Sequence, residues 1–163
     1  MTPVTIREMR PEDVDEVIRI VCANEPELEQ DARQEIGSPP EWLGCRYFVA
    51  ETDGAIRGVM GYCGDRWGAP GVMWSVWLFV HPDYHRRGIA TLLYQRIEAE
   101  LRRAGCRKAY LDVGNADTHA SAIAFHVRNG YKLEGTLEDY WGDGEDCLLF
   151  GKPLNDNPGR QQE

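Results

Sequence analysis

The sequence predicts one domain of the mixed α/β class, with a mostly antiparallel sheet of about six to seven strands and about four flanking helices. Two observations support this class. Residues 72–80 are rich in Val and aromatic side chains, as in a buried strand, and a helix over 88–104 and a strand over 108–113 follow them. This order makes the helix a right-handed crossover between two parallel strands. The second observation is the hairpin signal Asp53-Gly54, which joins antiparallel strands.

The first half of the chain begins with an alternating strand at 4–7. Pro11 and the acidic residues after it open a helix, because the positive end of the helix dipole favours negative charge. A second, very acidic helix is predicted at 27–36. Strands at 45–51 and 56–63 then flank the hairpin signal.

The second half contains two helices, at 88–104 and 120–129, which end at Gly105 and Gly130. A closing pair of strands is predicted at 131–137 and 147–154, joined by a loop over the acidic residues between them. The polar chain from Asn155 contains Pro and Gly and is predicted to be disordered, so that the domain covers residues 1–154.

The bulk composition excludes several classes of protein. A net charge of −9 argues against a nucleic-acid binder. No apolar run approaches the roughly 20 residues that span a membrane, and no secretory signal opens the chain, so we expect a cytoplasmic protein. The cysteines are odd in number and widely spaced, which favours buried thiols over a disulfide framework or a metal site. They are Cys22, Cys45, Cys63, Cys106 and Cys147.

The junction between the central strand and its helix carries the first functional signal. A helix start has unpaired backbone N–H groups and the positive end of the dipole. Gly88 lets a ligand approach the backbone closely, and Arg86 and Arg87 stand beside it. This combination suits a phosphate group. The alternative is a basic helix start that binds nothing.

The same stretch resembles the pyrophosphate-binding loop of the GNAT superfamily of N-acetyltransferases. Val80-His81-Pro82-Asp83-Tyr84 and Arg86-Arg87-Gly88-Ile89-Ala90 fit its pattern, whereas His85 stands where Gln or Arg is usual. The resemblance implies that the two parallel strands splay apart, that acetyl-CoA lies in the gap, and that backbone amides bind it. The implied donor-binding residues are Leu78, Phe79, Val80, His85, Arg86, Arg87, Gly88, Ile89, Ala90, Thr91 and His119.

A second stretch, from Ala122 to Tyr131, resembles another GNAT signature. His119 stands at the family's Asn, and His126 at the Tyr that acts as general acid toward the departing thiolate. A histidine with a pKa near ~6.5 is mostly neutral at pH 7. His126 is therefore predicted to donate a proton as imidazolium or a hydrogen bond as neutral imidazole. The alternative is a structural histidine.

The base that deprotonates the acceptor amine is less clearly marked, because strand 72–80 contains no carboxylate. Asp112 is the predicted base, since Leu111-Asp112-Val113 resembles the Leu-Glu-Val of the ribosomal-protein N-terminal acetyltransferases. A structural Asp, or a water chain from Glu51 or Asp65, remains open. The acidic helix at 27–36 either attracts the amine or is a solvated surface.

Together these features predict an acetyl-CoA-dependent N-acetyltransferase that acts on a primary amine, with no metal. The acceptor is a peptide N-terminus, because residues 139–147 also resemble the ribosomal-protein enzymes, or a small amine, as in resistance-type acetyltransferases. Neither nucleic acid nor a membrane is an expected partner, and the edge strands leave room for a homodimer. The alternative function is a non-catalytic acyl-CoA-binding regulatory domain.

Overall fold

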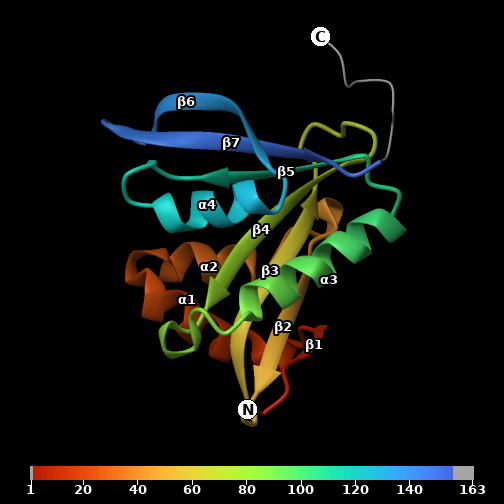
Figure 1. The fold of residues 1–163 in the computed structure, drawn as a ribbon, viewed down its shortest axis with the longest axis vertical. Coiled ribbons are helices and arrows are strands. Elements are labelled where there is room, and N and C mark those ends of the chain that lie inside the picture. The colour runs from red at the N-terminus through yellow and green to blue at the C-terminus, as the bar shows by residue number, and fades with distance from the viewer. Residues whose placement is uncertain (1, 156–163) are drawn as a thin grey trace.

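The computed structural model of the protein describes residues 2–155, in which a central sheet carries helices on both faces (Figure 1). No helix in this part of the chain is long and apolar enough to cross a membrane. The strands are β1 (Thr5–Glu8), β2 (Arg46–Thr52), β3 (Ala55–Gly64), β4 (Val72–Val80), β5 (Lys108–Val113), β6 (Lys132–Gly142) and β7 (Glu145–Pro153), and the α-helices are α1 (Val14–Asn24), α2 (Glu29–Glu35), α3 (Ile89–Arg103) and α4 (Ala120–Arg128).

The sheet runs in the order β1-β2-β3-β4-β5-β7-β6. Neighbouring strands are antiparallel except β4 and β5, which are parallel. The predicted mixed class is confirmed. β4 and β5 pair only from Val72–Lys108 to Trp74–Tyr110 and then separate, as Figure 1 shows. We call the gap between residues 75–80 of β4 and 111–113 of β5 the fork.

The helices cover the two faces of the sheet in pairs, and each pair has its own core. α3 buries Ile89, Leu93, Ile97 and Leu101 against one face, where residues of α4 also pack. Their spacing of four residues places these side chains on one face of α3. α1 and α2 pack on the opposite face, around Val17, Ile18, Val21, Ala32 and Ile36. The fork therefore lies between two helical layers.

β4 contains a bulge beside the fork. Val59 of β3 pairs with Phe79, but Gly61 pairs with Val76, so β4 has one residue more than β3 in this interval. Trp77 takes the extra position with a φ of 54°, a value uncommon for a residue other than Gly. Val76 and Trp77 consequently pack on the same face of the sheet. A bulge also leaves backbone groups of the strand without ladder partners.

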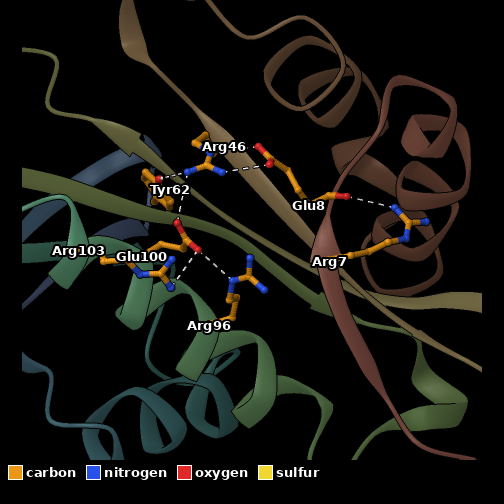
Figure 2. A network of polar contacts seen from close by, with 7 residues as sticks. All are labelled: Arg7, Glu8, Arg46, Tyr62, Arg96, Glu100 and Arg103. Atoms are coloured by element: carbon orange, nitrogen blue, oxygen red, sulfur yellow. Dashed lines mark hydrogen bonds and ion pairs between the residues drawn. The ribbon is translucent and has the colours of Figure 1, made fainter.

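A network of charged residues joins α3 to the first strands (Figure 2). Glu100 is buried and contacts Arg46, Arg96 and Arg103 at 3.3, 3.0 and 3.4 Å. Arg46 of β2 also binds Glu8 of β1 through two hydrogen bonds of 3.0 Å. α3 is thereby tied to the edge of the sheet that lies farthest from β6.

Two sequence-based predictions need correction. The stretch 138–146 is not a loop: β6 and β7 extend through it and meet at a tight turn over Asp143 and Gly144. Acidic residues are uncommon in strands, so the sequence did not predict the hairpin, whose strands contain Tyr140 and Trp141. Cys45 and Cys63 are not free thiols but form a disulfide, because the register of β2 and β3 places them opposite one another. The predicted disordered tail lies outside the described residues from 156 onward.

Candidate active site at the fork

The loop between β4 and α3 presents a row of free backbone amides. Gly88, with a φ of 80°, precedes the first residue of α3, and the first helical hydrogen bond runs from the N–H of Leu92 to the carbonyl of Gly88. Within the described residues, the N–H groups of 86–91 make no hydrogen bond. His85 holds the loop against the end of β4, since its Nε2 lies 2.8 Å from the carbonyl oxygen of Val80. These amides suit an anion such as a pyrophosphate.

The cationic side chains beside this loop are partly fixed by stacking. The guanidinium groups of Arg57 and Arg87 lie 4.6 and 4.7 Å from the centre of the Tyr84 ring. The Tyr84 hydroxyl donates a hydrogen bond of 3.1 Å to Asp53. Tyr84, Asp53 and Arg87 line a surface cavity of about 270 Å³ that also touches Thr52. The side chain of Arg86 is exposed and, within the described residues, neither stacks on an aromatic ring nor forms an ion pair.

On the α3–α4 side, the fork is lined by an aromatic cluster that includes His126. The His126 ring lies 5.7 Å from Phe125 and 6.1 Å from Tyr131, and both of these rings lie within 6 Å of Tyr94. His126 is 8% exposed, and burial lowers its pKa to about 4. It is therefore neutral at pH 7. Its Nδ1 is buried without a partner, which favours the tautomer with the proton on Nε2.

On the α1–α2 side, two carboxylates face the fork from different elements. Glu35, at the end of α2, accepts a hydrogen bond of 2.9 Å from Nε1 of Trp77 at the bulge. Asp112 lies on β5, in the part of the strand that has left β4. Asp112 is solvent-exposed, and partial desolvation by the surrounding protein raises its pKa, which the negative charge of Glu35 raises further. Trp74 and Tyr110 stack beside them, with ring centres 5.3 Å apart.

The other carboxylates considered as bases are engaged elsewhere. Asp65 accepts hydrogen bonds from the backbone of Trp67 and Ala69 and from Nε1 of Trp74, and these bonds lower its pKa. Glu51 is bound to Arg7 at 2.8 Å. Asp65, whose pKa is lowered, is a poorer proton acceptor than Asp112, whose pKa is raised.

His119 lies at the start of α4, seven residues before His126 and thus about 10 Å away along the helix. Its Nδ1 lies 3.1 Å from the carbonyl oxygen of Asn115 and 2.9 Å from the Thr118 hydroxyl. Its Nε2 lies 3.7 Å from a carboxylate oxygen of Glu25. The ring therefore links the start of α4 to the end of α1.

The structure brings most of the predicted residues to one region. Leu78, Val80, the 85–91 loop and His126 lie on the α3–α4 side of the fork, whereas Phe79 and Asp112 lie on its other side. Sequence reasoning missed the contact between Glu35 and Trp77 and the bond between Ser75 and Tyr131. Glu35 stood out only as one of several acidic residues, and no sequence signal marks a bulge at a tryptophan.

Known proteins identify the family. The family model described as acetyltransferase (GNAT) family matches residues 14–131. The chain belongs to the GNAT family of acetyltransferases. An acetyltransferase of Sodalis glossinidius is 32% identical over 157 residues, which cover 91% of this chain and 94% of the relative. The predicted family and enzyme class are thus confirmed, and acetyl-CoA is the co-substrate that GNAT enzymes use.

Solved GNAT structures share the fold at low sequence identity. The ribosomal-protein-S18-alanine N-acetyltransferase of Escherichia coli has a TM-score of 0.77 at 19% identity and covers 99% of both chains. An aminoglycoside 6′-N-acetyltransferase complexed with coenzyme A has a TM-score of 0.76 at 16% identity, over 94% of this chain and 99% of that one. The two scores are nearly equal, so the GNAT fold alone does not select an acceptor.

Proposed function

We propose that this GNAT protein transfers the acetyl group of acetyl-CoA directly to a primary amine that carries positive charge. One observation carries the proposal: the fork opens toward a loop of free amides at one end and toward Asp112 and Glu35 on the opposite face of the sheet. A donor bound on one face and an amine bound on the other can meet in the gap between β4 and β5.

The amides of 86–91 are the proposed cradle for the donor's pyrophosphate. Leu78, Phe79 and Val80 offer the backbone edge of β4 to the pantetheine arm, because no strand pairs with them on the β5 side. The bulge at Trp77 leaves backbone N–H groups near the reacting end of the fork. Such a group stabilises the negative charge that develops on the thioester oxygen during attack.

Asp112 is the proposed general base. The acceptor arrives as an ammonium ion and must lose a proton before its nitrogen can attack. A carboxylate whose pKa is raised accepts this proton more readily than an ordinary Asp. Glu35 adds negative charge that attracts the cation, and the stacked Trp74 and Tyr110 offer aromatic faces to it.

His126 is the proposed partner of the leaving sulfur. The C–N bond forms as the C–S bond breaks, and the electron pair stays on sulfur. Because His126 is neutral at pH 7, it acts as a hydrogen-bond donor through Nε2 rather than as an imidazolium acid. Replacement of His126 by Phe should therefore slow turnover more than it weakens binding of acetyl-CoA.

The acceptor is proposed to be either a peptide N-terminus or a small cationic amine. The hairpin of β6 and β7 exposes Tyr140 and Trp141, with rings 4.7 Å apart, and gives a peptide an aromatic surface to contact. The acidic residues of α2 suit a polyamine or an aminoglycoside equally well.

The test measures release of coenzyme A from acetyl-CoA with N-terminal peptides, polyamines and aminoglycosides as acceptors. We expect turnover with at least one class and its loss in Asp112→Asn. Calorimetric titration with acetyl-CoA runs in parallel. Binding of acetyl-CoA without turnover on any amine would support the non-catalytic alternative, and no binding would remove the proposed donor site.

A further inference from the structure

The fork has a direction that fixes where the acyl group of a donor must lie. Its open end is at Val80, next to the amides of the 86–91 loop, and its closed end is at the last β4–β5 pair, Trp74–Tyr110. From Val80 to Ser75 the strand spans about 17 Å. A donor held by its pyrophosphate at the loop, as we propose above, therefore points its acyl group toward the closed end.

Tyr131 fills this closed end. It lies three residues after the end of α4 and is only 3% exposed. Its hydroxyl lies 3.3 Å from the hydroxyl of Ser75, the first residue of β4 beyond the last pair with β5. The Tyr131 ring meets Tyr94 edge-on at 5.9 Å and packs against His126 at 6.1 Å. Tyr131 is thus held on several sides and cannot easily move aside.

Little free space remains behind Tyr131. A void of about 10 Å³ lies beside it and is lined by Ser75, Tyr94, Glu98 and Tyr131, among others. Such a volume holds at most one water molecule. The Tyr94 hydroxyl is buried without a hydrogen bond of normal geometry, which makes a water the natural occupant. An acyl chain longer than acetyl finds no ready space there.

We infer that the ring of Tyr131, packed against Tyr94 and His126, closes the fork and restricts the donor to short acyl groups. The restriction follows from packing, because a rigid aromatic ring in a filled core does not yield to an added methylene without displacing its neighbours. One methylene that does not fit an enzyme's apolar site typically changes discrimination by about 10- to 200-fold. Tyr131 is, in this inference, a specificity-determining residue for the donor.

The experiment compares dissociation constants for CoA, acetyl-CoA and butyryl-CoA by calorimetry, which requires no acceptor. The wild type should bind acetyl-CoA at least 10-fold more tightly than butyryl-CoA. Tyr131→Ala should reduce this ratio to about 3-fold or less by gaining affinity for butyryl-CoA. Tyr131→Phe is the matched control, because it keeps the ring and should keep the ratio.

Two results would overturn the inference. The first is a wild type that binds butyryl-CoA as tightly as acetyl-CoA. The second is a folded Tyr131→Ala protein, or Tyr131→Leu if the Ala variant does not fold, that keeps the wild-type ratio. Failure of the wild type to bind CoA itself would instead reject the proposed donor site, so the two failures are distinguishable.

Discussion

At the level of single residues, the titration of His126 has a measurable consequence for stability. Its pKa is about 4 in the folded protein and about 6.5 when exposed, so the unfolded chain binds more protons between these values. Stability is therefore lost as the pH falls from about 6.5 toward 4, and the loss reaches about 3 kcal/mol. His126→Phe should remove this part of the acid sensitivity. Urea unfolding at pH 7.5 and pH 4 measures the loss of stability in the wild type and in the variant. If both proteins lose the same free energy of unfolding between these pH values, His126 is not the group responsible.

Asp112 and Glu35 give a second prediction at this scale, in the pH dependence of the reaction. A base must be deprotonated, so kcat/KM for the amine should fall below the pKa of Asp112. The charge of Glu35 raises this pKa, and Glu35→Gln should lower it and move the acidic limb of the profile to lower pH. Asp112→Asn should reduce kcat/KM by about 100-fold or more. A limb that does not move in Glu35→Gln would mean that another group titrates.

At the level of elements, the proposed anion site at the start of α3 can be tested by comparing substitutions at the two ends of this helix. Gly88 and Gly105 have φ values of 80° and 75°, and a Cβ atom at either would meet nothing within 4 Å. A tryptophan strains both positions alike, but only Gly88 lies among the free amides. Gly88→Trp should weaken CoA by about 100-fold, as expected from losing two charge-assisted hydrogen bonds of about 1.5 kcal/mol each. Gly105→Trp should leave CoA affinity unchanged, and equal losses in the two variants would reject the site. Calorimetry measures both.

The strands differ in how well the sequence predicted them. Strand β4 and strand β5 were predicted with their observed bounds, because Val and aromatic runs are strong local signals. The tip of the β6–β7 hairpin was predicted to be a loop, because acidic residues occupy its exposed strand positions. Pairing between strands determines such positions, and it has no signal in the local sequence. The bulge at Trp77 was equally hidden, because a positive φ at a tryptophan is imposed by packing and not by its own preference.

At the level of the whole molecule, contacts between distant segments were the least predictable. The family motifs pointed to the fork, and the fold confirms that β4 and β5 separate there. The roles of His126 and Asp112 stay predictions. The Cys45–Cys63 bond depends on the register of two strands, which cysteine spacing does not encode. The Ser75–Tyr131 bond joins residues 56 positions apart and likewise needs the assembled core.

The fork also raises the question of what holds the two halves of the sheet together, since β4 and β5 share only a short paired segment. α3 bridges them. Glu98 of α3 binds Lys152 of β7 at 2.9 Å, and Glu100 binds Arg46 of β2 through the network of Figure 2. α3 is therefore a brace across the fork as well as the carrier of its amide loop.

This bracing predicts the effect of Glu100→Gln on stability. The change leaves Arg46, Arg96 and Arg103 around a neutral side chain at a buried position. Breaking a fully buried ion pair typically costs 3–5 kcal/mol, but these arginines retain access to water, so we expect a loss of about 2 kcal/mol. Glu29→Gln is the control, because its ion pair with Arg33 is exposed and should contribute less than about 0.5 kcal/mol. Urea unfolding at pH 7.5 compares the variants. Equal effects of the two substitutions would show that α3 is held by its apolar face alone.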